Sequence, residues 1–206
     1  MKAEINKHSS IKLIGEKTIY FDPFELENEP HDADIIFFTH SHYDHLSPQD
    51  AAKCAKEDTV FVAPASCEAD LTKNGFHNAV FFTAGEEKTV NGIAVTAVPA
   101  YNISKPFHPR ANGWLGYVVV TDGEKIYVAG DTDALPENET IACDVAFVPV
   151  GGMFTMNAEK AAAFVNAMLP KKAIPTHYGS VVGKADDGER FASLLNASVK
   201  TELLIK

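Results

Sequence analysis

The chain has 206 residues, which is enough for one substantial domain and few for two. Its formal charge of −10 comes from 18 basic and 28 acidic side chains, and the basic residues form no stripe. Because neutralised phosphates supply most of the affinity for nucleic acid, we expect no nucleic-acid partner. The chain also lacks the run of about 18 apolar residues that a membrane-spanning helix needs, so we expect no membrane contact.

The N-terminus indicates a cytoplasmic protein, and the cysteines indicate a chain without disulfides. Residues 1–7 contain no apolar core that could serve as a signal peptide. The three cysteines, Cys54, Cys67 and Cys143, form no Cys-x-x-Cys pair, and their odd number argues against a disulfide framework. We therefore expect reduced thiols that pack as small apolar side chains.

The first half of the chain alternates short strand-like runs with short helical ones. The run 34–39 contains Ile-Ile-Phe-Phe, which is typical of a strand buried on both faces. Ser47 precedes Pro48, a pair that predicts the start of a helix. In chain order we expect strand 18–21, strand 34–39, helix 48–56, strand 59–63 and helix 66–74, which Gly75 closes.

The second half begins with hairpins. The pairs Asn91-Gly92 and Asp122-Gly123 each separate two β-prone runs, which is the strongest short-range signal for a hairpin. Asn157 is placed to cap an alanine-rich helix. After the first hairpin we expect strands 114–121, 125–129 and 144–150, helix 157–168, strand 172–176, helix 188–196 and strand 200–205.

These elements predict a layered α/β protein with a single domain that spans residues 1–206. Segments 17–22 and 125–131 resemble each other, since each reads as a strand that stops at an aspartate. A duplicated half and a chance match both explain so short a similarity.

Four potential metal ligands follow the buried strand 34–39 within six residues: His40, His42, Asp44 and His45. His40 and His42 are two apart, so in an extended backbone they point the same way and could bind one metal ion. A turn would bring Asp44 and His45 to a second one. Imidazole nitrogen and carboxylate oxygen are the usual ligands of catalytic zinc, and the alternative is a polar surface loop.

The pattern His-x-His-x-Asp-His after a hydrophobic strand resembles the signature of the metallo-β-lactamase superfamily. Other pieces follow in the same order: Asp22 after an early strand, Gly130-Asp131-Thr132 after a hairpin strand, and His177 after a late strand. The resemblance implies a four-layer αββα sandwich with two mixed β-sheets and the metal ions at one edge. Details such as 107–109 and 175–179 are similar to the small ascorbate-phosphate lactonase-like hydrolases of that superfamily.

The resemblance also implies how the ligands divide between two metal ions. His40 and His42 would bind the first ion, and Asp44 and His45 the second. Asp131 would bridge the two ions with its two oxygens, and His177 would complete the second site.

One ligand of the first ion departs from the family pattern. The superfamily usually supplies another histidine before the bridging aspartate, where this chain has Ala100-Tyr101-Asn102. His108 is the only histidine between His77 and Asp131, so we assign it as the third ligand of the first ion. A substrate-facing or surface position is the alternative, and single-metal occupancy would then follow.

Other polar residues have supporting or open roles. Asp22 is expected to accept a hydrogen bond from a ligating imidazole, with a simple Asp-Pro turn as the alternative. His8, His31 and His77 show no partner pattern and are expected on the surface. Candidate pocket residues are Tyr101, Asn102, Lys105, Arg110 and Tyr178.

The implied reaction is the attack of a metal-bound hydroxide on an ester, lactone or phosphodiester of a small molecule. We expect Asp44 to orient the hydroxide and take a proton. Two zinc ions are expected, although Mn²⁺ and Fe²⁺ accept the same ligands. Redox members of the superfamily carry Glu in place of His42, so His42 favours hydrolysis. Lys105 and Arg110 would suit an anionic substrate, or they are solvated loop charges.

Two other functions remain open at this level. One is a nuclease of the same superfamily, which the net charge disfavours. The other is a non-catalytic metal-binding protein that kept the fold. The substrate and the oligomeric state are not determined by the sequence.

Overall fold

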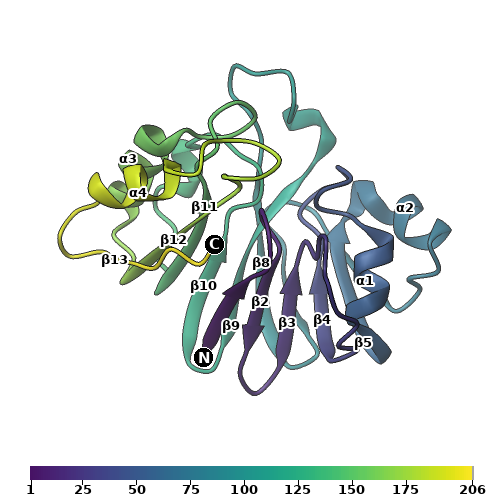
Figure 1. Ribbon diagram of the computed structural model, residues 1–206. Coiled ribbons are helices and arrows are strands. Elements are labelled where there is room, and N and C mark those ends of the chain that lie inside the picture. The colour runs from purple at the N-terminus through teal and green to yellow at the C-terminus, as the bar shows by residue number, and fades with distance from the viewer. Residues whose placement is uncertain (206) are drawn as a thin grey trace.

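Two mixed β-sheets pack face to face, and helices cover the outer side of each sheet (Figure 1). This arrangement is seen in a computed structural model that describes residues 1–205. The helices α1 (Pro48–Cys54) and α2 (Glu68–Lys73) lie on the first sheet, and α3 (Ala158–Met168) and α4 (Asp187–Ser193) on the second. The predicted four-layer αββα sandwich is therefore confirmed.

The first sheet has the strand order β1-β2-β3-β4-β5-β6, which is also the order in the chain. The strands β1, β2 and β3 pair antiparallel, and β3 to β6 pair parallel. Their bounds are Lys2–Ile5, Ile11–Ile14, Thr18–Phe21, Ala33–Phe37, Ala55–Pro64 and Ala79–Phe82.

The second sheet has the order β13-β12-β11-β10-β9-β8-β7. The strands β7 to β10 pair antiparallel, and β10 to β13 pair parallel. Their bounds, from β7 to β13, are Glu87–Val90, Ile93–Pro99, Leu115–Thr121, Glu124–Val128, Val145–Pro149, Lys172–Thr176 and Lys200–Thr201. Short 3₁₀ turns cover Ala65–Cys67, Arg110–Asn112 and Pro136–Asn138.

The main core lies between the two sheets because alternate strand residues point inward. Phe21 of β3 stands beside Phe37 of β4, and their stacked rings are 4.6 Å apart. Tyr117 of β9 packs on Phe37 from the opposite sheet at 5.1 Å. The intervening residue Ile36 points outward and packs beneath α1 and α2. The strand β4 is therefore buried on both faces, as the apolar run in 34–39 predicted.

Local turn and cap signals predicted the structure well. Both hairpins are present, and Asn91 and Asp122 have φ angles of 47° and 49°, which suit the tight turns that join β7 to β8 and β9 to β10. Ser47 caps α1 by accepting from the amide of Asp50, and Asn157 caps α3.

Several boundaries and three elements were predicted wrongly. The helix expected at 48–56 ends at Cys54 because Ala55 already pairs with Ala33 in β5. The helices expected at 66–74 and 188–196 are shorter, and the strand expected at 200–205 ends at Thr201. The strands β1, β2 and β6 were not predicted.

Segments 17–22 and 125–131, which resemble each other in sequence, occupy equivalent places in the two sheets. The strand β3 pairs antiparallel with the preceding strand and parallel with the next one, and β10 does the same in the second sheet. Asp22 follows β3, and Asp131 follows β10 after Gly130. Both aspartates therefore lie where the carboxyl ends of parallel strands meet, which is the edge that carries the site.

Two further expectations concern the whole chain. All three cysteines are free, and Cys54 and Cys67 are buried. Within residues 1–205, no helix combines the length and apolar character that a bilayer crossing requires.

Candidate metal centre

The loop that follows β4 forms the middle of the site. The amide groups of His45 and Leu46 both donate to the carbonyl oxygen of His42, at 3.0 and 2.8 Å. This tight turn brings His45 back beside His40, and the two imidazole rings are 4.0 Å apart. The turn expected between the two halves of the cluster is therefore present.

The structure brings all seven predicted ligands together. Their ligand atoms fall into overlapping groups in which every atom lies within 4.8 Å of the others. One group contains His40, His42 and His108; a second contains Asp44, His45 and His177 together with His8; a third joins His40 and His45 to Asp131. The roles of these residues in metal binding stay predictions.

Asp131 lies at the centre of the histidines. Its Oδ2 atom is 2.9 Å from Nε2 of His177 and 3.1 Å from Nε2 of His108. Its Oδ1 atom is 3.4 Å from Nε2 of His45. One carboxylate therefore faces imidazoles from both halves of the site, as a bridging ligand must.

His108 reaches the site although the chain has Tyr101-Asn102 at the family's usual position. The loop between β8 and β9 brings its ring within 5.0 Å of the His42 ring and 5.2 Å of the His40 ring. Trp114 closes the group, with its ring 4.7 Å from that of His42. The His108 side chain is 1% exposed, which excludes the surface position.

The prediction that His8 lies on the surface is wrong. The turn between β1 and β2 buries His8 completely, and its Nε2 atom is 3.2 Å from Oδ2 of Asp44. Its ring is 3.9 Å from the His177 ring, and its carbonyl oxygen accepts the amide of His177 at 3.0 Å. No spacing in the sequence indicates this contact, because His8 and His177 lie far apart in the chain and the two short strands that position His8 were not predicted. His31 and His77 are exposed, as expected.

Buried acceptors fix the orientation of three imidazoles. Oδ2 of Asp22 lies 2.7 Å from Nδ1 of His45. The hydroxyl of Thr39 donates to Asp22 at 2.6 Å and accepts from Nδ1 of His40 at 2.9 Å. Oδ1 of Asn102 lies 3.2 Å from Nδ1 of His108. A proton on each Nδ1 leaves Nε2 as the basic nitrogen, so these contacts prepare the Nε2 atoms to bind a cation.

The electrostatics of the metal-free site also favour a cation. Burial holds the pKa of His40 well below its usual value and lowers that of His42, which keeps both rings neutral. Burial acts to raise the pKa of Asp131, but His177 and His45 outweigh it and hold that pKa well below its usual value. Burial acts to lower the pKa of His45, but Asp131 and Asp22 raise it well above the usual value. A bound metal would take the place of the His45 proton.

Buried polar atoms without hydrogen-bond partners indicate whether the histidine cluster suits a metal ion. The buried atoms Nε2 of His45, Nε2 of His108 and Oδ1 of Asp131 have no hydrogen-bond partner among residues 1–205. Buried polar groups are normally paired, so such a concentration marks a missing ligand. Imidazole nitrogens with carboxylate oxygens suit a divalent transition metal. The residues present therefore fit the metal.

The pocket residues suggested by the sequence are mostly tied to the protein. The ammonium group of Lys105 is 2.8 Å from Oδ1 of Asp133. The guanidinium of Arg110 stacks 5.1 Å from the ring of Tyr101, whose hydroxyl donates to Glu137. Lys105 is therefore paired with an acidic residue, whereas the exposed guanidinium of Arg110 keeps its N–H donors available. Tyr178 is buried, and Asn102 holds His108.

The surface next to the site is apolar. A pocket of about 460 Å³ is lined by residues 150–154 and 181–184 with Asn157 and Asp187, and its lining includes none of the predicted ligands. Two contacts place this pocket next to the site. Gly151 lies so close to His177 that a Cβ atom added to it would be 2.2 Å from the His177 carbonyl oxygen. Phe154 contacts Phe107, the neighbour of His108 in the chain. Large apolar side chains on the loops at this edge are exposed: Tyr43, Ile103, Phe107, Met153 and Val181.

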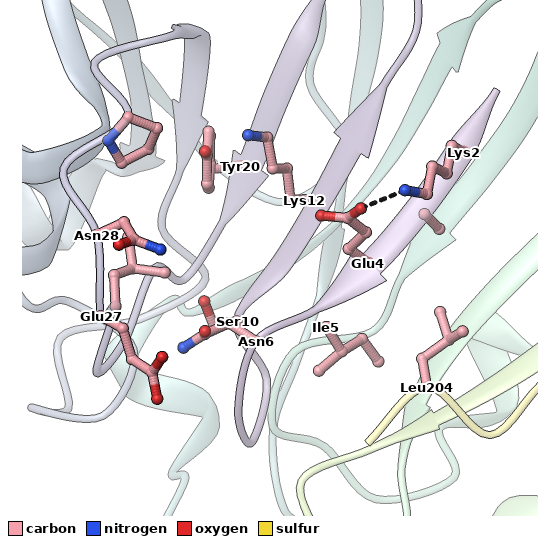
Figure 2. Close-up of a pocket in the computed structure, with 13 residues that line it drawn as sticks. Lys2, Glu4, Ile5, Asn6, Ser10, Lys12, Tyr20, Glu27, Asn28 and Leu204 are labelled. Carbon is pink, nitrogen blue, oxygen red and sulfur yellow. Dashed lines mark ion pairs between the residues drawn. The ribbon is translucent and has the colours of Figure 1, made fainter. Parts of the chain in front are cut away.

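A larger cavity of about 770 Å³ lies on β1, β2 and β3, and its lining includes none of the predicted ligands (Figure 2). Glu4, Lys12 and Tyr20 are neighbours in register there. Their charges are paired, since Lys2 lies 2.6 Å from Glu4 and Lys12 lies 2.7 Å from Asp32. This cavity does not compete with the histidine cluster as the site of chemistry.

Comparison with known proteins decides the family. Residues 10–178 match the beta-lactamase superfamily domain. The chain belongs to the metallo-β-lactamase superfamily. Within this superfamily it is 33% identical over 221 residues to a metal-dependent hydrolase of the UPF0173 group from Thermococcus onnurineus, which covers 100% of this chain and 96% of the relative. A UPF0173 metal-dependent hydrolase from Thermoplasma acidophilum is 33% identical over 91% of this chain and 87% of its own.

A solved metallo-β-lactamase-fold structure confirms the architecture. The crystal structure of a proposed metal-dependent hydrolase from Parabacteroides distasonis has a TM-score of 0.83 and 30% identity, and the match covers 99% of this chain and 93% of that one. The chain thus belongs to the metal-dependent hydrolases of the metallo-β-lactamase superfamily, as the motif at 40–45 predicted.

Proposed function

We propose that this protein hydrolyses an ester, lactone or phosphodiester of a small molecule with the help of two zinc ions. The observation that carries the proposal is the arrangement around Asp131, whose two oxygens face histidines from both halves of the site. The proposed functional unit is a single domain that spans the chain. Its proposed location is the cytoplasm, where free thiols such as those of this chain persist.

The proposal assigns each ligand to one of two positions. His40, His42 and His108 would hold the first ion, and Asp44, His45 and His177 the second. Asp131 would contact both. When bound, such a metal pair lowers the pKa of a coordinated water from about 15.7 toward 7 and polarises the bond under attack.

Asp44 is the proposed catalytic residue. Its side chain is 12% exposed, whereas that of Asp131 is 3% exposed, so Asp44 is the carboxylate that solvent can approach. Burial acts to raise the pKa of Asp44, but hydrogen bonding to His8 and the charge of His45 lower it to about 2. The carboxylate is therefore ionised at neutral pH and can accept a hydrogen bond from the attacking water.

The surroundings support a substrate with an apolar portion. The pocket beside His177 and the exposed side chains of Phe107 and Met153 offer apolar surface next to the ligands. The sequence suggested an anionic substrate through Lys105 and Arg110. Lys105 does not support that suggestion because it is paired with Asp133, whereas the exposed Arg110, stacked on Tyr101, remains compatible with it.

The test combines metal analysis with a substrate screen. Purified protein, stripped with a chelator and reloaded with Zn²⁺, Mn²⁺ or Fe²⁺, is assayed on p-nitrophenyl esters, lactones and bis-p-nitrophenyl phosphate. We expect two metal ions per chain and hydrolysis of at least one class, with both strongly reduced in His42→Ala. Exposed His77→Ala is the matched control.

Two results would overturn the proposal. Protein that keeps two metal ions but cleaves none of these classes would be a metal-binding protein without this activity. Preferential cleavage of RNA with steep salt dependence would indicate a nuclease instead.

A further inference from the structure

His8 is a buried imidazole that the proposed function does not assign to a metal ion. Its side chain is 0% exposed, its Nδ1 atom has no hydrogen-bond partner among residues 1–205, and the polar neighbour of its Nε2 atom is the Asp44 carboxylate, 3.2 Å away. A buried polar group without a partner destabilises a protein unless something else satisfies it. We therefore looked for a group that His8 could bind.

The backbone fixes the position of His8 on both sides. The turn between β1 and β2 closes through the amide of Ser10, which donates to Lys7 at 2.8 Å, and the amide of Asn6, which donates to Ser10 at 3.0 Å. His8 itself has a φ of 57°, in the left-handed region that non-glycine residues adopt rarely. The amide of His177 donates to the His8 carbonyl oxygen at 3.0 Å. The turn thus carries the imidazole to the end of β12.

The imidazole of His8 points into the second half of the metal centre. Its Nε2 atom lies 3.2 Å from Asp44 Oδ2, and its ring lies 3.9 Å from the His177 ring and 5.8 Å from the His45 ring. One ligand atom of His8 is within 4.8 Å of ligand atoms on all three of these residues. The exposed histidines His31 and His77 have no place in such a group of described residues.

We propose that His8 is an additional protein ligand of the metal ion held by Asp44, His45 and His177. This inference rests on the metal centre of the proposed function and deepens it. Counting Asp131 for both ions, five side chains would then surround the second ion and four the first. Because the second ion would have one more protein ligand, we expect it to be bound more tightly than the first.

The alternative is that His8 only positions Asp44 by hydrogen bonding. The two roles differ in metal binding: a ligand changes the affinity and coordination of one ion, and a positioning residue leaves the number of imidazoles on the metal unchanged. The experiment must therefore measure metal affinity and coordination, and not only activity.

The test compares His8→Asn with His31→Asn. Asparagine tolerates the left-handed backbone, and His31 also has a positive φ, of 46°, but is exposed, so the two substitutions are matched in chemistry and backbone. Metal content after dialysis, zinc affinity by competition with a chromophoric chelator, and the absorption spectrum of Co²⁺-loaded protein are measured. Thermal unfolding in EDTA checks that both variants fold.

For wild type and His31→Asn we expect two metal ions per chain and the same Co²⁺ absorption spectrum. For His8→Asn we expect a Co²⁺ spectrum that is changed by the loss of one imidazole. We also expect the affinity for one ion to fall by more than the about 10–100-fold that loss of a hydrogen-bond partner of a ligand causes. Two ions held with unchanged affinity and spectrum in His8→Asn would overturn the inference while leaving the proposed function intact. Wild-type protein that binds no zinc would instead overturn the proposed function.

A second measurement needs no variant. In a crystal structure of zinc-loaded wild-type protein, a ring nitrogen of His8 should lie about 2.0–2.1 Å from one zinc ion. A separation beyond about 3 Å would exclude ligation and leave His8 as a neighbour of Asp44.

Discussion

The carboxylate of Asp22 lies 2.7 Å from Nδ1 of His45 and, through the hydroxyl of Thr39, is also connected to Nδ1 of His40. One buried side chain at the end of β3 thus orients an imidazole in each half of the metal centre. Asp22 also accepts the amide of Thr39 at 2.8 Å, which joins the ends of β3 and β4. Asp22 therefore acts on the site by orienting His40 and His45, and not by contacting a substrate.

Replacing Asp22 should weaken metal binding. In Asp22→Asn, one carboxylate oxygen becomes a donating NH₂ group. The side chain can then no longer accept from the Thr39 amide at one atom and from the Thr39 hydroxyl and His45 Nδ1 at the other, so both imidazoles lose orientation. We expect zinc affinity to fall about 10–100-fold, measured by chelator competition. Asp58→Asn is the control, because its side chain is 80% exposed. Equal affinities in the two variants would show that Asp22 does not orient the ligands.

His108 should determine the occupancy of one position only. In His108→Ala, the first group loses one of its three imidazoles, while the group around Asp44 and His177 is untouched. We expect elemental analysis to give about one metal ion per chain in place of two. Retention of two ions would place the third ligand of the first ion elsewhere. His77→Ala, at an exposed position, should keep both ions.

Bound metal should stabilise the folded chain. The unfolded chain has no preformed site, and folded metal-free protein leaves Nε2 of His45 and His108 without partners. At a free zinc concentration of 100 times Kd, one site contributes about 2.7 kcal/mol, which corresponds to a rise in Tm of about 5–11 °C for a chain of this size. Differential scanning calorimetry with and without EDTA measures the shift. An unchanged Tm would contradict a folded-state metal site.

Asp50 should make stability depend on pH in the acid range. Its carboxylate accepts the amides of Glu25 and Leu26, both at 3.0 Å, and the ammonium of Lys53 at 2.9 Å. Burial acts to raise its pKa, but Lys53 and Ser47 lower it below the usual value. Because the folded pKa is depressed, this stabilisation is present above the unfolded pKa of about 3.9 and is lost as the pH falls through the folded pKa.

The substitution Asp50→Asn isolates this contribution. We expect a loss of about 1.5–3 kcal/mol in the free energy of unfolding at pH 7, measured with urea, and a smaller difference from wild type as the pH falls below about 4. Asp58→Asn, at an exposed position, should change stability little at either pH. A difference that stays constant from pH 7 to pH 3 would show that ionisation of Asp50 is not responsible.

The predictions from sequence succeeded where the structural cause is local. The Asn91-Gly92 and Asp122-Gly123 turns form because residues that tolerate positive φ stand at both turn positions. Ser47 and Asn157 begin helices because their side chains reach amides within the next turn. The strand β1 was missed because its four residues alternate charged and apolar side chains too briefly to give a periodic signal, and only pairing with β2 makes them a strand.

The candidate site divides in the same way. The sequence by itself determined the cluster from His40 to His45, since the ligands are consecutive and one strand and one turn suffice to aim them. Asp131 and His177 could be named by resemblance, but their convergence depends on two sheets that meet at one edge. Only the tertiary structure placed His8, because its partner His177 lies at the other end of the chain and the contact exists only once β1, β2 and β12 have packed together. Side chains that long-range packing brings together leave no recognisable spacing in the sequence. Side chains that a single turn orients stand close together in the sequence and can be recognised there.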